Sequence, residues 1–255
     1  MSQIEAARLR LSVIVPSWDD RDHLRRLVPE LVRLKSLREV IVVDVTPHPI
    51  TAEMVRNGGG TYLHSGAPNR GEQMNLGAGH ACGDVLIFHH ADSLLTQQHV
   101  AAISDALRDP AIIGGAFYRR FDERHRRLRP LEMIARFLTR HGGSFFGDQS
   151  IFVRREVFEA LGGFAPLPLM EDIEFSRRLR RAGPVAVLDP PLTSSSRRHL
   201  RRGPWRTSIE NGTLIVLYRC GVSPAALHRW YYRERFPPPN ESILAAESLE
   251  EFGRR

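Results

Sequence analysis

Acidic side chains follow three short apolar runs of the sequence. The runs are residues 11–15, 40–43 and 85–88; Asp19 and Asp20 follow the first, Asp44 follows the second and Asp92 follows the third. Because the carboxyl ends of parallel strands open onto one crevice, we expect these three carboxylate-bearing strand ends to face it together. Asp44 could accept a hydrogen bond from a ribose hydroxyl or a base N–H. Asp92, with or without His90, could hold a divalent cation against a diphosphate.

Each of these residues also has a purely structural interpretation. Asp44 could cap the turn that contains Pro47, and Asp92 could be the N-cap of the helix that follows it. His89 and His90 could be exposed loop histidines instead of metal ligands. Arg70, which begins a predicted helix, could be a solvated surface charge or could bind phosphate at the helix N-terminus.

Two further acidic segments lie in the second half of the chain. Asp148 and Gln149 precede a short predicted strand, and Glu171 and Asp172 open a predicted helix. Acids in a first helical turn normally complement the helix dipole, and we favour that interpretation for Glu171. The same dipole keeps Asp172 ionised, which a proton acceptor needs before it acts. Asp172 is therefore a candidate general base.

The elements that would hold these residues alternate between strand and helix. Strands are predicted at 11–15, 40–43, 61–63 and 85–88, with helices at 22–35, 51–56 and 72–82 between them. The second half predicts strands at 112–118, 151–153 and 185–188, and helices at 97–107, 130–139, 155–161, 170–181 and 205–220. This alternation predicts an α/β fold with a doubly wound, mostly parallel sheet flanked by helices. We expect one catalytic domain over residues 1–236, with residues 11–93 as its nucleotide-binding half, residues 94–236 as its acceptor side, and a loose tail at 237–255.

Bulk composition excludes several classes of protein. The 255 residues are 42% hydrophobic and 25% charged, which is typical of a globular domain. No apolar stretch approaches the roughly 20 residues of a membrane span, and the first ten residues lack the apolar core of a signal peptide, so we expect a cytoplasmic protein. The two cysteines, Cys82 and Cys220, have neither metal-ligand nor redox spacing. Neither a G-x-G-x-x-G fingerprint nor a P-loop is present.

The net charge of +7 is unevenly distributed. Residues 119–140 contain eight arginines and three acids, and residues 197–206 contain five arginines and no acid. Such stretches can be solvated faces, can bind an anionic acceptor, or can rest on an anionic membrane. Peripheral contact with the inner membrane face therefore stays open. Nucleic-acid binding is disfavoured, because the sequence has no recognised binding module and few aromatics among its arginines.

Six segments in this order resemble glycosyltransferase family 2, the inverting enzymes of GT-A fold. They are Ser12–Pro16, Val40–Asp44, Asn69–Asn75, Phe88–Asp92, Phe146–Gln149 and Met170–Asp172. The resemblance covers residues 11 to about 200. Within the family the chain looks closest to a bacterial subgroup that is labelled as acting in arsenosugar biosynthesis.

The resemblance implies a role for each matching residue. Pro16, Ser17, Asp44 and Arg70 would bind the donor nucleotide, and Arg198 would face its diphosphate. Asp92 matches the last acid of the family's D-x-D metal element, whose first acid is replaced here by His90; Mn²⁺ or Mg²⁺ would be the cofactor. Asp148, Gln149 and Glu171 would lie on the acceptor side, with Asp172 as the catalytic base.

The predicted function is transfer of a sugar from a nucleotide-diphosphate sugar, with UDP preferred, to an acceptor hydroxyl. One alternative is a non-catalytic protein that binds nucleotide sugars. A second is a nucleotidyltransferase on a similar fold, although Pro16 and Ser17 lack the Gly-rich basic first loop typical of that class. The motifs leave the sugar, the acceptor and the oligomeric state open.

Overall fold

The computed structural model describes residues 9–235, apart from 47, 67, 123–125, 127 and 195–202. Eight strands in this part of the chain form one sheet with the order β3-β2-β1-β4-β7-β6-β8-β5. The strands are β1 Leu11–Ser17, β2 Leu37–Asp44, β3 Thr61–His64, β4 Val85–Phe88, β5 Ser93–Leu94, β6 Gly114–Phe121, β7 Ile151–Arg154 and β8 Val185–Ser194. The helices are α1 Arg21–Val32, α2 Pro49–Asn57, α3 Arg70–His80, α4 Gln97–Ala106, α5 Arg129–Arg140, α6 Arg155–Ala160, α7 Glu171–Ala182, α9 Pro204–Arg219 and α10 Pro224–Arg235, with the short 3₁₀ helix η1 at Gly147–Gln149.

The strand order reverses at β1, which lies between β2 and β4. β1 pairs in parallel with both neighbours, and β2 pairs in parallel with β3. β7 is inserted antiparallel between β4 and β6, whereas β6 and β8 are parallel. The predicted α/β architecture, a mostly parallel sheet flanked by helices, is confirmed. The reversal places the carboxyl ends of β1 and β4 at the edge where such sheets bind ligands.

Helices cover both faces of the sheet, which explains why β1 is apolar along nearly its whole length. Val13 and Val15 belong to a core cluster with the buried face of α1, and Ile14 belongs to a second cluster with α3. A Cβ on Gly77 of α3 would lie 2.5 Å from Cγ2 of Ile14. The small residue at 77 therefore lets α3 approach β1 closely.

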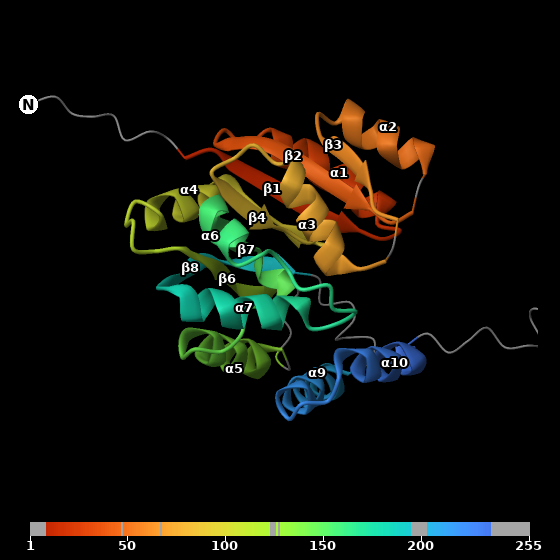
Figure 1. Cartoon of the computed structure of the whole chain (residues 1–255), viewed down its shortest axis with the longest axis vertical. Coiled ribbons are helices and arrows are strands. Elements are labelled where there is room, and N and C mark those ends of the chain that lie inside the picture. Colours follow the sequence, from red (N-terminus) through yellow and green to blue (C-terminus); the bar gives the residue numbers. More distant parts are fainter. Residues whose placement is uncertain are drawn as a thin grey trace, which may run out of the picture.

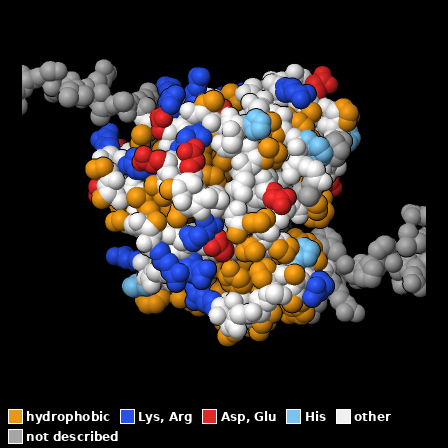
Figure 2. Space-filling view, viewed as in Figure 1, with side chains coloured by type: hydrophobic (Ala, Val, Ile, Leu, Met, Phe, Trp, Pro, Cys, Tyr) orange, Lys and Arg blue, Asp and Glu red, His pale blue; other side chains and the backbone are white. Residues whose placement is uncertain are grey.

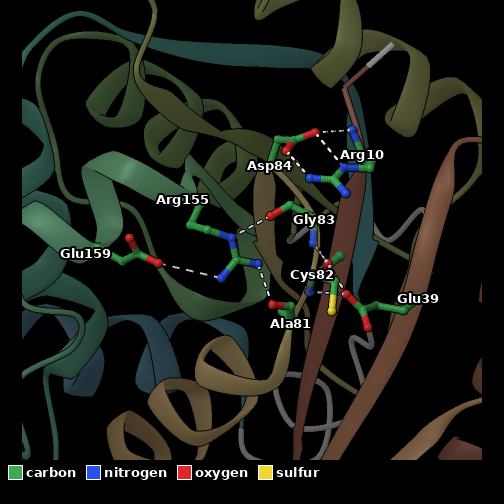
Figure 3. A network of polar contacts seen from close by, with 9 residues as sticks. Arg10, Glu39, Ala81, Cys82, Gly83, Asp84, Arg155 and Glu159 are labelled. Carbon is green, nitrogen blue, oxygen red and sulfur yellow. Dashed lines mark hydrogen bonds and ion pairs between the residues drawn. The ribbon is translucent and has the colours of Figure 1, made fainter. Parts of the chain in front are cut away.

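The C-terminal end of α3 is fixed by a polar network at the edge of the sheet opposite the crevice (Figure 3). Arg155 donates to the carbonyls of Ala81 and Gly83 at 2.7 Å each, and to the carbonyl of Ala78 at 3.3 Å. Arg10 and Asp84 form an ion pair at 2.7 Å, which lowers the pKa of the Asp84 carboxyl to about 2. The last carbonyls of α3 are thus satisfied by a cation, which also suits the helix dipole.

Two C-terminal helices pack on the beginning of α7. Their cluster contains Met170, Ile173, Leu214 and Leu227, all buried. Figure 1 shows α9 and α10 together at the lower end of the molecule, with α7 above them and α5 to the left of α9 in this view. The helix at 205–220 was predicted, whereas α10 was not identified from the sequence. No helix in the described ranges has the length and apolarity needed to cross a bilayer.

Candidate active site

Asp44 and Ser17 lie side by side at the carboxyl ends of β2 and β1, where their Cα atoms are register partners. Asp44 is buried and accepts from the backbone N–H of Thr46 at 3.3 Å and from the Tyr62 hydroxyl at 3.4 Å. Asp44 therefore does cap the turn that follows β2. Ser17 is also buried, and its Oγ has no hydrogen-bond partner within the described part of the chain. A buried hydroxyl in that state is available to a ligand that binds at this edge.

Gln73 joins the ends of the first two strands to α3. Its Nε2 donates to the carbonyl of Ser17 at 2.9 Å and to the carbonyl of Val43 at 2.8 Å. Sequence reasoning did not select Gln73 as a site residue. The available signal was an amide on the otherwise small and apolar face of a predicted helix. Pro16, also predicted here, is buried within β1.

Arg70 is the first residue of α3 and is exposed. Asn69 caps the helix, because its Oδ1 accepts from the backbone N–H of Glu72 at 3.1 Å. The positive charge of Arg70 lowers the pKa of Glu171 and of Asp172, against the larger opposing effect of burial. Arg70 therefore lies in the field of the acids that open α7, in the position where a helix N-terminus binds anions.

Asp92 is exposed and follows β4 after a short turn. It does not cap the next helix, since the N-cap of α4 is Thr96; the capping interpretation of Asp92 is wrong. Burial raises the pKa of Asp20, and the negative charge of Asp92 raises it further while Arg70 lowers it. Asp20, Arg70 and Asp92 therefore face the same crevice, as the strand pattern predicted for the two acids.

The two histidines after β4 have different environments. His89 is fully buried, with Nδ1 at 2.6 Å from Ser150 Oγ and Nε2 at 3.0 Å from the carbonyl of Ser93. Burial lowers its pKa to about 4, so the exposed-loop interpretation of His89 is wrong. His90 packs against η1, because a Cβ on Gly147 would overlap the imidazole Nε2 of His90. Glycine at 147 is required for this contact.

Asp172 lies in the first turn of α7 and faces η1. Its Oδ2 accepts from the backbone N–H of Gly147 at 2.8 Å, and its Oδ1 accepts from the backbone N–H of Ile173 at 2.7 Å. Burial raises the pKa of Asp172, and the two backbone donors lower it. Neighbouring Glu171 is buried, and burial together with the charge of Asp172 raises its pKa to about 7. Two neighbouring carboxyls, one of which raises the pKa of the other, therefore lie at one helix N-terminus.

The two η1 residues predicted for the acceptor side differ in what they contact. Asp148 Oδ2 pairs with Arg119 Nη1 of β6 at 2.7 Å, and both side chains are about a quarter exposed. Gln149 is buried, with Oε1 accepting from the backbone N–H of Phe146 at 2.9 Å and Nε2 at 3.4 Å from Thr139 Oγ1. Arg119 was not identified as a site residue, because in the sequence it is one of many arginines in its stretch.

The side chains available to a metal ion are few. In the portion of the chain that is described, no three His, Cys, Asp or Glu side chains gather closely enough to hold an ion by themselves. The exposed carboxylate of Asp92 nevertheless fits a hard divalent cation whose remaining oxygen ligands come from phosphate and water. Arg198, predicted for the diphosphate, lies outside the described residues.

Comparisons with known proteins agree with this architecture. The model of Glycosyl transferase family 2 matches residues 12–162. The mannosyltransferase PcManGT from Pyrobaculum calidifontis, solved with GDP-Man and Mn²⁺, is similar with a TM-score of 0.65 at 18% identity, over 96% of this chain and 81% of that chain. Glucosyl-3-phosphoglycerate synthase from Mycobacterium tuberculosis, solved with Mn²⁺, UDP and glucosyl-3-phosphoglycerate, gives a TM-score of 0.58 at 19% identity, over 84% and 81% of the two chains. S. aureus TarS is similar with a TM-score of 0.58 at 14% identity, over 92% of this chain and 77% of that chain. No curated protein sequence matches the chain.

Proposed function

Because the chain belongs to glycosyl transferase family 2 and is a glycosyltransferase of GT-A fold, we propose that it acts on a nucleotide-diphosphate sugar and inverts the anomeric carbon. The observation that carries this proposal is Asp172, a carboxylate held by two backbone donors at a helix N-terminus and in the field of Arg70. A base in this position can take the proton of an acceptor hydroxyl while the hydroxyl oxygen attacks the sugar.

The donor nucleotide is proposed to lie along the ends of β1 and β2. Asp44 and Ser17, with Pro16 beneath them, would contact the base and ribose, and the buried Oγ of Ser17 would gain a partner. Arg70 and the N-terminus of α3 would bind the diphosphate, which fits their positive potential. Arg198 is proposed to contribute there as well.

A divalent cation is proposed to be held by Asp92 together with oxygens of the donor diphosphate. His90 is proposed as a second protein ligand. Its Nε2 is buried against Gly147, so the exposed carboxylate of Asp92 would be the main protein ligand. When bound, the cation would neutralise charge that develops on the leaving diphosphate. Two of the similar solved structures contain Mn²⁺, which supports this choice of ion.

The acceptor is proposed to approach from the side of η1 and α7. Glu171 and Asp148 would border it, and Arg119 would hold the Asp148 carboxylate in place through their ion pair. Gln149 would fix the conformation of η1, because its amide oxygen accepts from the backbone N–H of Phe146 and its amide nitrogen donates to Thr139 Oγ1. Membership of the arsenosugar subgroup is likewise a proposal, and mass spectrometry of the glycosylated product would test it.

Calorimetric titration with UDP, GDP and dTDP, each with and without Mn²⁺ or Mg²⁺, tests the donor assignment. We propose UDP as the preferred nucleotide, and similar structures contain UDP or GDP-Man. The expected result is metal-dependent binding of one nucleotide, lost in Asp92→Ala and retained in Asp105→Ala, which removes an exposed acid from α4. Binding without any metal dependence or turnover would instead favour the non-catalytic alternative. Release of pyrophosphate from a nucleoside triphosphate would favour a nucleotidyltransferase.

We also propose that the protein rests on an anionic membrane through α5. This helix exposes Met133, Ile134, Phe137 and Leu138, with exposed fractions between 51% and 72%. Residues at these spacings share one helical face, and the exposed Arg129 and Arg140 flank them. An apolar face bordered by arginines is typical of helices that lie in the headgroup region of anionic bilayers.

A further inference from the structure

A pocket of about 520 Å³ lies along α7, from Ile173 next to Asp172 to Arg181 near the end of the helix. It is bounded by α7, by the residues that follow α5, and by the end of α9. Four of its lining residues are arginines and none is acidic: Arg177, Arg180 and Arg181 come from α7, and Arg219 comes from α9. Ser144, Ser176 and Tyr218 add three hydroxyl-bearing side chains to the same walls.

Glu174, an acid on the same helix, is paired mainly with an arginine outside the pocket lining. Glu174 is engaged by Arg178, whose guanidinium reaches both of its carboxylate oxygens at 2.6 to 2.9 Å. Arg177 is left with a contact of 3.9 Å to the same carboxylate. Within the described ranges, no carboxylate forms an ion pair with Arg180, Arg181 or Arg219. The pocket therefore concentrates positive charge from two helices.

Arg180 is the most unusual member of this set. Its Nη2 donates to the carbonyl of Thr139 at 3.0 Å, and its guanidinium lies over the ring of Phe145 at 4.1 Å. Its Nε is buried and has no hydrogen-bond partner in the described structure. Burial lowers the pKa of Arg180. Its charged form has lost solvation, and no carboxylate in the described ranges forms an ion pair with it, so its burial costs free energy. An arginine on a solvated helix face has neither a buried, unpartnered Nε nor a pKa lowered by burial.

Figure 2 shows the setting of the pocket, with basic side chains gathered over α7 beside hydrophobic side chains over α9. We propose that this pocket binds a phosphate group of a ligand other than the sugar donor. Phosphate oxygens match several guanidinium forks at once, and the volume admits a small phosphate ester or a lipid headgroup. Arg180 is eight residues beyond Asp172, about 12 Å along the helix axis.

The test is titration of inorganic phosphate at constant ionic strength, followed by the shift of Tm that binding produces. Arg177→Gln/Arg219→Gln is the pocket variant, and both side chains are exposed, so the fold should be retained. Arg206→Gln is the matched control, since Arg206 is an exposed arginine of α9 outside the pocket. Arg70→Gln reports on phosphate bound at the donor crevice.

The expected result is that the pocket variant binds phosphate at least tenfold more weakly, while Arg206→Gln and Arg70→Gln bind as the unmodified protein does. Equal binding in the pocket variant, no binding at all, or loss confined to Arg70→Gln would overturn the proposal. Flotation with phosphatidylcholine vesicles containing phosphatidylglycerol distinguishes two sources of the phosphate. If the pocket variant loses vesicle binding, the phosphate belongs to a lipid headgroup. If vesicle binding is unchanged, the phosphate belongs to a soluble ester. The donor assignment is independent of this outcome, because it depends on Asp92.

Discussion

Asp172 experiences two opposing influences on its protonation. Burial favours the neutral acid, whereas the backbone N–H groups of Gly147 and Ile173 and the charge of Arg70 favour the carboxylate. A general base works best when its pKa lies near the working pH. The balance therefore suits proton abstraction better than an exposed aspartate with its ordinary pKa would.

Asp172→Asn should lower kcat by about 10²–10⁴-fold, because the amide cannot take a proton from the acceptor. Donor binding should change little, since Asp172 is not proposed to contact the nucleotide. Steady-state kinetics with calorimetric donor titration would separate the two effects. Full activity in this variant, or a product that retains the anomeric configuration of the donor, would contradict the proposed mechanism.

Glu171→Gln should make folding stability less dependent on pH. The pKa of Glu171 is raised from 4.5 to about 7 in the folded protein, so between these values the native state binds more protons than the unfolded state. Its contribution to the free energy of unfolding therefore falls as pH rises from about 4.5 to 7. Denaturant unfolding at several pH values would measure the slope, with Glu53→Gln on α2 as a control that should leave it unchanged.

The same variant should also change the pH dependence of kcat/KM. The charge of Asp172 helps to raise the pKa of Glu171 to about 7, so a step near pH 7 in the kcat/KM profile that comes from Glu171 should be absent from Glu171→Gln. A step that persists in the variant would mean that another group titrates there.

At the scale of elements, apolar periodicity was sufficient for the parallel half of the sheet. The run at 85–88 coincides with β4, and the helical pattern at 72–82 overlaps α3. β5 was missed because two residues carry no periodicity, and its pairing with β8 depends on contacts about 100 residues apart in sequence. The environment of His89 was misjudged for the same reason, since its partner Ser150 comes from the distant segment before β7.

The candidate site was only partly visible in the sequence. Acids after strands could be placed at the carboxyl edge, because strand direction alone determines that edge. Gln73 and Arg119 could not, because their roles arise from partners on other elements. The contact between His90 and Gly147 is likewise a tertiary contact between two segments that the sequence separates widely.

Arg155→Met should lower the free energy of unfolding by about 2–4 kcal/mol, because three backbone carbonyls at the end of α3 lose a charged donor. Since α3 carries Arg70 at its other end, donor affinity should fall as well. Urea denaturation and donor titration would measure both effects. Arg108→Met removes an 82% exposed arginine and should change stability by less than about 0.5 kcal/mol; similar losses in both variants would show that the network contributes nothing specific.

For the whole molecule, one sheet joins the proposed nucleotide side to the proposed acceptor side. β4 and β7 pair antiparallel at the centre, so the crevice is bordered by helices from both parts of the chain. The N-termini of α3 and α7 both face it, as the effect of Arg70 on Glu171 and Asp172 indicates. Two positive helix ends would therefore act on the anionic donor, in addition to any bound cation.

The face of α5 that points away from the sheet exposes large apolar side chains. The opposite side is anchored, because Glu132 accepts from the backbone N–H of Phe121 at 2.7 Å and Arg136 pairs with Asp189 at 2.8 Å. Ile134 and Phe137 project outward and are 51% and 61% exposed. We expect the protein to sediment with vesicles of phosphatidylcholine and phosphatidylglycerol, and less with phosphatidylcholine alone, since the flanking arginines add electrostatic attraction.

Ile134→Asn/Phe137→Asn should weaken this vesicle binding at least tenfold, because each large apolar side chain contributes about 1.5–3 kcal/mol when it is fully buried. Ile50→Asn is the matched control, since Ile50 on α2 is 56% exposed and lies on a different helix. Equal loss in the control would mean that vesicle binding does not depend on the exposed face of α5. If the unmodified protein does not sediment with anionic vesicles, the exposed face of α5 serves some other contact, and the arginines around it do not attract a membrane.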